Sequence, residues 1–455
     1  MAQRKPTNPR TAQQAKSRRR SRRRLKPWIP FAGIGLLVVI IAVIIIILVS
    51  DKGKSGNKPD SGTTPAPGET TESTAPDETT TIGEPEIISS ITVGSTGDIL
   101  IHPSVLAAFD YGDHHDFNGA FTYVAPYYSK LDLMVVNLEV PLVDPDDGYE
   151  YSSNPFGSPD AVAEALKNAG TDVCLTANNH TYDMGSYGLH RTQRVLKEYG
   201  LDYTGTRQDE SDSFILVEDV KGIKLGMICY TYETGGKSLN YIPIDYEDEE
   251  MVNTFDYENL DAFYSDDRRQ LAQMDELGCD LKIFYMHWGE EYEDYPRDYQ
   301  TEIAQALCDM GVDVIIGGHP HVVQMFDVLK SDNGHQMLCL YSMGNELSNQ
   351  RRDIMNEDDY RGYTEDGVIF ILNIDKYNTG DVIISGIDAI PTWVQRDDSF
   401  EIIPLDPNKD PSEWANDEYY YGVESYNRTM GRLGDAFFEF RAEHGQADIP
   451  RELEY

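Results

Sequence analysis

The stretch VDVIIGGHPH, residues 312–321, is an apolar run that stops at two glycines and then presents two histidines. The same design, an apolar run closed by polar residues, occurs at residues 88–98, 131–139, 171–180 and 281–289. Apolar runs of about four to eight residues bounded by turn residues are typical of strands that are buried in a sheet. The sequence therefore predicts five buried strands, each of which ends in polar side chains.

Helical patterns lie between these strands, at residues 159–170, 187–200 and 297–311. Strands that alternate with amphipathic helices indicate an α/β domain with a largely buried sheet. After Gly334 the pattern changes to apolar runs separated by turn residues, at residues 336–345, 367–374 and 381–390. We expect these runs to be antiparallel strands that complete a second sheet.

The composition supports a globular domain and excludes several other classes of protein. Of the 455 residues, 40% are hydrophobic and 25% are charged, which is enough apolar surface for a core and excludes a wholly disordered or fibrous chain. The five cysteines lie in or beside apolar runs and show no C-x-x-C spacing. We interpret them as core residues, so a zinc site built from cysteines is not expected.

The N-terminal part of the chain has the pattern of a membrane anchor. Residues 31–49, FAGIGLLVVIIAVIIIILV, contain no charged or polar side chain, and a helix of this length spans about 28 Å, close to the hydrocarbon thickness of a bilayer. The 11 Lys and Arg residues before it favour a cytoplasmic N-terminus. We predict a basic cytoplasmic segment at residues 1–27 and a single transmembrane helix at residues 28–50. A cleavable signal peptide is the alternative, but residues 50–56 offer no clear cleavage site.

The remainder of the chain is expected to lie outside the cytoplasmic membrane. Residues 51–86 are rich in Thr, Pro, Gly and Ser and predict a disordered linker. The folded domain is expected at residues 87–405, and an acidic, aromatic, helical extension at residues 406–455 either packs on it or forms an appendage. Residues 51–455 carry a net charge of −51, which disfavours nucleic acid as a partner of the folded domain.

Polar residues of the types that bind metals or transfer protons stand where the five strands end. They are Asp98, Glu139, Asn178, Asn179, His180, His287, His319 and His321. Each residue alone has a structural explanation, such as a turn, a helix cap or a buried hydrogen bond. In open α/β sheets, however, ligands bind beyond the carboxyl ends of the strands, so five such ends are expected to converge. Imidazole and carboxylate groups together favour Mn, Fe or Zn over Mg²⁺ or Ca²⁺.

This ordered set of motifs resembles the calcineurin-like metallophosphoesterase fold and, within it, the bacterial capsule-synthesis (CapA, poly-γ-glutamate) family. The motifs that carry the resemblance are GDIL, NLEVPL, TANNHTYDMG, HWGEEY, GGHPHVVQ and YSMGN, which occur in this order between residues 97 and 345. The resemblance implies a four-layer α/β/β/α sandwich around a pocket for two divalent metal ions. It implies no other cofactor.

The resemblance also implies a role for each residue that matches a motif. Asp98 and His321 would bind one metal ion, and Glu139 would bridge the two ions. The ligands of the second ion would be Asn179, His287 and His319. His180 would be the general acid or would contact the leaving group. Asp183 would orient the His180 imidazole.

Two departures from the metallophosphoesterase pattern affect these assignments. The usual Asp-x-His is replaced by Asp98 followed by His102, so His102 is only a candidate ligand. The usual Gly-Asp-x-x-Asp is replaced by Asn137-Leu138-Glu139, which puts a longer carboxylate at the bridge. Asn345 also matches the family, but a Gly-Asn turn explains it equally well.

Three functions remain open from the sequence. The first is a metal-dependent hydrolase or transferase that acts on a cell-envelope polymer. The second is a non-catalytic polymer-binding or export component of capsule or poly-γ-glutamate synthesis, with other membrane subunits as candidate partners, whose metal pocket binds the polymer. The third is an extracellular binding module that has kept only the fold.

Overall fold

The computed structural model describes residues 84–145, 149, 156–351, 355, 363–395, 399–414 and 419–447. All of the described residues belong to one compact unit of the chain, residues 82–455. The expected cytoplasmic segment and transmembrane helix, and nearly all of the expected linker, lie outside the described residues. Within the described ranges, no helix is long and apolar enough to cross a membrane.

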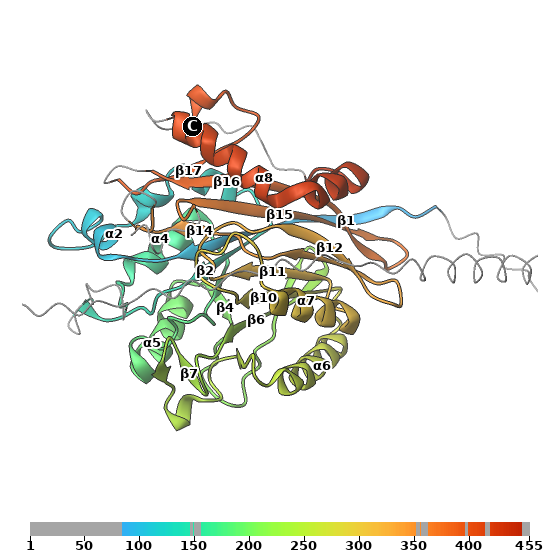
Figure 1. The fold of residues 1–455 in the computed structure, drawn as a ribbon, viewed down its shortest axis with the longest axis horizontal. Helices are drawn as coiled ribbons and strands as arrows, with labels where there is room; N and C mark the ends of the chain where they lie inside the picture. Colours follow the sequence, from blue (N-terminus) through green and yellow to red (C-terminus); the bar gives the residue numbers. More distant parts are fainter. Residues whose placement is uncertain are drawn as a thin grey trace, which may run out of the picture. The chain divides into compact units, whose positions relative to one another are not determined.

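The first sheet has the strand order β17-β16-β15-β1-β2-β3-β4, with β14 paired to β1 (Figure 1). Strands β1 to β4 are parallel to one another, whereas β15, β16 and β17 extend the sheet on the other side of β1 in antiparallel pairs. The bounds are β1 (Ile87–Ile99), β2 (Leu133–Leu138), β3 (Val173–Leu175), β4 (Asp202–Thr204), β14 (Asn345–Leu347), β15 (Asp366–Tyr377), β16 (Val382–Val394) and β17 (Ile402–Pro404).

The second sheet has the strand order β12-β13-β11-β10-β6-β5, with β9 paired to β6. Strands β6, β10, β11 and β13 run parallel to one another, and the outer strands β5 and β12 are antiparallel to their neighbours. The bounds are β5 (Leu216–Val220), β6 (Ile223–Tyr232), β9 (Thr254–Phe255), β10 (Leu281–His287), β11 (Val314–Gly318), β12 (Phe326–Lys330) and β13 (Gln336–Leu340). A short hairpin, β7 (Ser238–Leu239) and β8 (Ile242–Pro243), follows β6.

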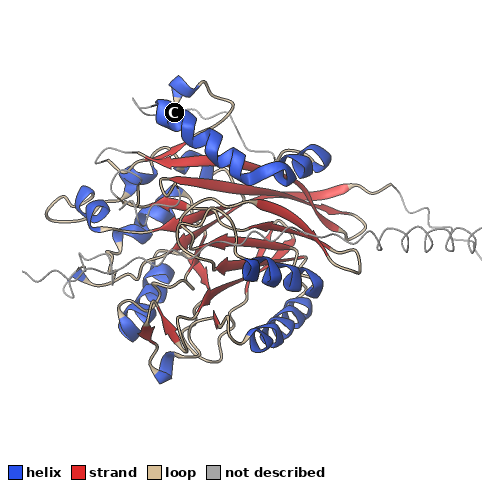
Figure 2. Cartoon of the chain, viewed as in Figure 1, coloured by secondary structure: helices blue, strands red, loops and turns tan. Residues whose placement is uncertain are grey.

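The two sheets pack face to face, and helices cover their outer faces (Figure 2). One core cluster joins side chains of both sheets, such as Val93 and Val135 of the first and Met227 and Ile283 of the second. A second cluster lies between the first sheet and helices α4 (Ala161–Ala169) and α5 (Gly185–Glu198). A third lies between the second sheet and helices α6 (Leu260–Leu277) and α7 (Asp298–Met310). The short helices α2 (Pro103–Ala108) and α3 (Ala125–Tyr128) contribute to the second cluster.

The C-terminal helix α8 (Tyr419–His444) packs on this domain and is not a separate appendage. It lies along β15 and β16 (Figure 1) and buries Leu433 and Phe437 in the cluster between the sheets. Arg428 fixes it from the side through two hydrogen bonds to the Asp366 carboxylate, of 2.9 and 2.7 Å. Such a bidentate arginine–carboxylate pair is geometrically specific, so α8 is held in one position.

The expectation that the apolar runs after residue 336 complete a second sheet together is wrong. β13 joins the second sheet and lies parallel to β11, whereas β15 and β16 extend the first sheet beside β1. An apolar run predicts that a strand is buried, but it does not specify the neighbouring strand. β6 and α6 were also not predicted, although residues 223–232 contain an apolar run with the same character as the others.

Candidate metal centre

The residues expected at a metal centre lie at the ends of strands from both sheets. Asp98 is the penultimate residue of β1, and Glu139 follows β2 directly. His287 ends β10, and the two remaining histidines follow β11. The side chains of all six expected ligands are buried, with 0–3% of each residue exposed, and these residues are Asp98, Glu139, Asn179, His287, His319 and His321.

Glycines and unusual backbone angles bring these side chains together. A Cβ atom at Gly318 would lie 2.8 Å from Asp98 Oδ1, so only glycine lets β11 approach the carboxylate. His319 and His321 both have positive φ angles, of 92° and 57°. Such angles are rare for residues with a Cβ atom and concentrate at functional sites. The GGHPH motif therefore brings the His321 ring and the His319 backbone N–H to the Asp98 carboxylate at the end of β1.

The Asp98 carboxylate forms several hydrogen bonds within the centre. Asn137 Nδ2 donates to its Oδ1 (2.7 Å), and the His319 backbone N–H donates to its Oδ2 (3.2 Å). His321 Nδ1 lies 3.1 Å from the same Oδ2 and 3.1 Å from Asn345 Oδ1. Both of these oxygens are acceptors, so the proton of the His321 ring lies on Nδ1. Nε2 is then the ring atom that remains for a metal ion.

Two imidazole nitrogens lie near the Glu139 carboxylate, and one of them also contacts Asn179. His287 Nε2 lies 2.8 Å from Asn179 Oδ1 and 3.5 Å from Glu139 Oε1. His321 Nε2 lies 3.9 Å from the same Glu139 oxygen. Two sets of donor atoms, each within 4.8 Å of one another, share this carboxylate: Asp98, Glu139 and His287, and Glu139, His319 and His321.

Two buried atoms in this cluster have no hydrogen-bond partner among the described residues. They are Glu139 Oε1 and His319 Nδ1. A buried acceptor that is left unsatisfied costs about 1–3 kcal/mol, and more when it is charged. A bound cation would satisfy both atoms, and imidazole, carboxylate and amide oxygen suit a divalent transition metal. The residues present therefore fit a metal ion.

The environment of the cluster raises the pKa of Glu139 and lowers the pKa values of His287 and His319. Burial and the negative charge of Asp98 raise the pKa of Glu139 well above its ordinary value. Burial also lowers the pKa of His287 to about 3 and that of His319 well below its ordinary value. Both rings are therefore neutral at pH 7, which is the form that binds metals.

His180 and Asp183 form a separate pair beside the cluster. His180 Nδ1 lies 2.8 Å from Asp183 Oδ2, and the Phe156 backbone N–H donates to the same oxygen (2.7 Å). The Phe156 ring packs edge-on against the imidazole, with 4.7 Å between the ring centres. This pair is buried, and neither residue belongs to the two sets of potential metal ligands.

The candidate ligand His102 belongs to neither set of potential metal ligands found among the described residues. Its Nδ1 accepts the backbone N–H of Asn349 (3.3 Å), and it stands before the first turn of α2. Asn345, by contrast, contacts His321 directly, and its Nδ2 donates to the Thr364 carbonyl (2.9 Å), which turns Oδ1 toward the imidazole. Its match to the family motif YSMGN was the signal available in the sequence.

Tyr232 is a site residue that the sequence did not reveal. It ends β6, and its hydroxyl lies 3.1 Å from His319 Nε2. Since β6 itself was not predicted, no signal placed Tyr232 at the carboxyl end of a strand. This contact leaves Nδ1, which has no hydrogen-bond partner among the described residues, as the ring atom that is available to a metal ion.

Comparisons with known proteins agree with the motifs. Residues 92–350 match the family model of the bacterial capsule synthesis protein PGA_cap. The chain is 29% identical over 268 residues to the capsule biosynthesis protein CapA of Bacillus anthracis, covering 57% of this chain and 60% of that one. It is 27% identical over 286 residues to the PGA biosynthesis protein CapA of Bacillus subtilis (strain 168), covering 61% and 67%.

Among solved structures, the crystal structure of TT1561 of Thermus thermophilus aligns with 9% identity over 62% of this chain and 94% of that one. The TM-score is 0.32, which is too low to support a conclusion about this chain. The chain covers less than two thirds of the length of the Bacillus anthracis relative, at 60%. The family model, in contrast, spans more than half of the chain, and the chain therefore belongs to the family of bacterial capsule synthesis proteins.

Proposed function

We propose that this protein is a metal-dependent hydrolase or transferase that acts on a cell-envelope polymer, such as poly-γ-glutamate or another capsular polymer. The observation that carries the proposal is the buried cluster in which Glu139 belongs to two sets of potential ligands and keeps an oxygen without a hydrogen-bond partner among the described residues. The two packed sheets with helices on their outer faces are, in this proposal, a four-layer metallophosphoesterase-like sandwich.

In this proposal the cluster holds two divalent ions, with Mn, Fe and Zn as the candidates. Asp98 and His321 would hold one ion, Asn179 (through its amide oxygen), His287 and His319 would hold the other, and Glu139 would contribute to both sites. The geometry also supports a second distribution, because His287 groups with Asp98 and His321 groups with His319. Such a pair of ions would supply positive charge at the attacked centre and an activated water.

His180 would hold or give a proton at Nε2. Asp183 Oδ2 accepts from both His180 Nδ1 and the Phe156 backbone, so the carboxylate fixes the ring orientation and keeps the proton on Nδ1. Nε2 is then the atom that exchanges a proton with a substrate group. Phe156 packs against the ring and shields this pair from water.

A second candidate is a non-catalytic polymer-binding or export component of a capsule synthesis complex. It is favoured by the absence of His102 from the described clusters, which leaves the ion beside Asp98 with few protein ligands. Ligands of the polymer itself would then complete the coordination. In either case we propose that residues 28–50 anchor the chain with its N-terminus inside and that the folded domain faces the cell exterior.

Metal analysis and activity of the same samples test the proposal. The purified full-length chain should bind Mn²⁺ or Zn²⁺, and His319→Ala and His287→Ala should each lower the metal content while leaving the fold intact. His180→Ala should keep the metal but abolish processing of the polymer, which is measured as complementation of capsule production. A wild-type chain that binds no transition metal after supplementation would refute both candidates.

A further inference from the structure

A cleft of about 680 Å³ opens beside the candidate metal centre. Asn179 and His319 line its inner end, so a molecule in the cleft would reach the expected metal ligands. The rest of the lining is dominated by aromatic and acidic side chains. They are Tyr232, Tyr241, Tyr257, Tyr292, Glu233, Glu290 and Glu291.

Two of the three acidic residues that line the cleft, Glu290 and Glu291, have no cationic partner among the described residues. None of the described residues that line it is a lysine or an arginine. Glu290 accepts a hydrogen bond from the Tyr299 hydroxyl (3.3 Å), and neither Glu290 nor Glu291 forms an ion pair with a described cation.

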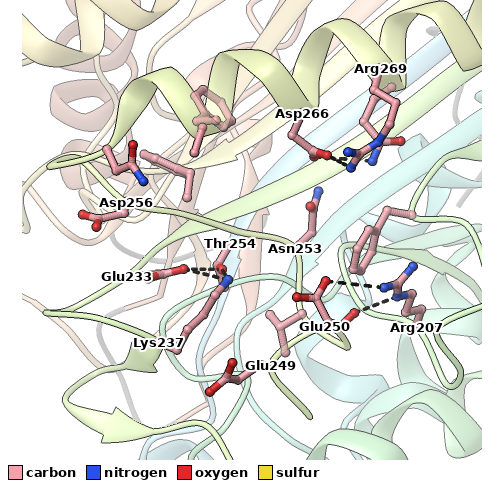
Figure 3. Close-up of a pocket in the computed structure, with 17 residues that line it drawn as sticks. Arg207, Glu233, Lys237, Glu249, Glu250, Asn253, Thr254, Asp256, Asp266 and Arg269 are labelled. Carbon is pink, nitrogen blue, oxygen red and sulfur yellow. Dashed lines mark hydrogen bonds and ion pairs between the residues drawn. The ribbon is translucent and has the colours of Figure 1, made fainter. Parts of the chain in front are cut away.

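A neighbouring cavity of about 330 Å³ shares the lining residue Glu233 with the cleft (Figure 3). Among the described residues that line this cavity, no lysine or arginine lacks an acidic partner. Its three basic side chains are each paired with an acidic residue of the same lining (Figure 3). Lys237 lies 3.0 Å from Glu233, Arg207 lies 3.8 Å from Glu250, and Arg269 pairs with Asp266. A polymer that bears many carboxylates would therefore meet repulsion in both hollows.

The aromatic side chains offer apolar surface between these acids. Tyr232 and Tyr257 stack with 5.9 Å between their ring centres. Tyr241 stands at the tip of the β7–β8 hairpin with 81% of its surface exposed. Tyrosine presents an apolar ring face and a polar tip, and carboxylates only accept hydrogen bonds, so their partners must be donors. Sugar units carry both complementary features, since they have apolar C–H faces and many hydroxyl donors.

We infer that the cleft binds an uncharged, hydroxyl-rich glycan segment of the substrate, and not a polycarboxylate segment. The inference rests on the proposed function, because it assigns the polymer that reaches the metal centre. The glycan lies along the tyrosines and donates hydrogen bonds to Glu290 and Glu291, and the linkage to be attacked reaches His319 and Asn179. Among envelope polymers, this selects a polysaccharide over poly-γ-glutamate.

Calorimetric titration of the purified full-length chain tests the inference, with and without added Mn²⁺. The probes are hexamers of N-acetylglucosamine, of glucose and of γ-linked glutamate at one ionic strength. At least one neutral hexamer should bind. The glutamate hexamer should bind at least about tenfold more weakly, because Glu290 and Glu291 repel its carboxylates. Tyr241→Ala and the double variant Glu290→Gln/Glu291→Gln should each weaken glycan binding by about tenfold. Glu302→Gln, an exposed charge on α7 outside the cleft, is the matched control and should change nothing.

Tighter binding of the glutamate hexamer, or no binding of either neutral hexamer, would overturn the inference. The double variant gives an independent check, since removing two charges should improve binding of the glutamate hexamer. Metal content measured on the same samples separates the two proposals. A chain that retains metal but prefers glutamate refutes only the glycan assignment, whereas a chain without metal refutes the proposed function whatever binds in the cleft.

Discussion

Replacement of Glu139 by glutamine should change the stability of the protein with opposite signs in the absence and presence of metal. Without metal, the variant removes a buried carboxylate whose Oε1 has no hydrogen-bond partner among the described residues. Glutamine carries no charge beside Asp98, and its amide N–H can donate to that carboxylate, so Glu139→Gln should be neutral or stabilising by about 1 kcal/mol in chelator. With metal, wild type gains about 2.7 kcal/mol for each site when the free ion is at 100 times its Kd. Glu139 belongs to both ligand sets, so the variant should lose most of this gain.

The assay is thermal or urea unfolding of both proteins in EDTA and in excess Mn²⁺. Glu346→Gln is the matched control, because Glu346 is also fully buried but accepts hydrogen bonds from the hydroxyls of Thr96 (2.6 Å), Thr392 (2.9 Å) and Tyr128. It should destabilise the protein equally with and without metal. The reasoning is refuted if Mn²⁺ leaves wild-type stability unchanged, or if Glu139→Gln gains as much from Mn²⁺ as wild type does.

Three further predictions concern other parts of the chain. His180→Ala should keep its metal but lower polymer processing by about 10²–10⁴-fold, and Asp183→Asn should lower it by about 10–100-fold. Asn179→Ala should instead lose metal. Equal function of His180→Ala and wild type would eliminate the proton-transfer role. Burial raises the pKa of Asp267 from 3.8 to about 8. Between these two values the Asp267 carboxyl ionises in the unfolded chain but stays protonated in the folded one. The free energy of unfolding should therefore fall as pH rises from about 4 to 8. Asp267→Asn should be more stable than wild type at pH 8, and urea unfolding at pH 5 and 8 checks this. Protease added to wall-stripped cells should leave only a short N-terminal fragment that includes residues 28–50, and full protection would contradict the proposed topology.

The strands that carry the centre were predictable because each is a run of apolar residues closed by a turn. β1, β2, β3, β10 and β11 all lie within or overlap the expected ranges. α6 was missed because its 18 residues are largely polar, and its buried side chains, such as Phe263, Leu271 and Met274, are widely spaced. The pairing of β15 with β1 was not predictable, since local sequence does not encode which strand lies beside which.

The convergence of the polar residues was predictable from a rule about strand ends, but their orientation was not. Parallel strands place their carboxyl ends at one edge of a sheet, so Asp98, Glu139 and His287 were expected to meet. Nothing in the sequence shows that His319 and His321 adopt positive φ angles, because such angles are rare for residues with a Cβ atom and depend on the surrounding tertiary structure. The same holds for Asn345, whose amide is turned toward His321 by the Thr364 carbonyl.

The rule about strand ends concerns the strands of a single sheet. The candidate ligands here come from two sheets, so a contact between the sheets is needed to align their strand ends. A buried hydrogen bond between the hydroxyls of Ser95 on β1 and Tyr285 on β10 (3.0 Å) joins them directly. Asp98 lies three residues beyond the first of these positions and His287 two beyond the second, so this contact sets how far each strand extends toward the centre. Leaving one hydroxyl unpaired inside the core costs about 1–3 kcal/mol, which penalises any sliding of one sheet over the other. A polar contact in the core that belongs to no catalytic motif therefore helps to align the candidate ligands of the two sheets.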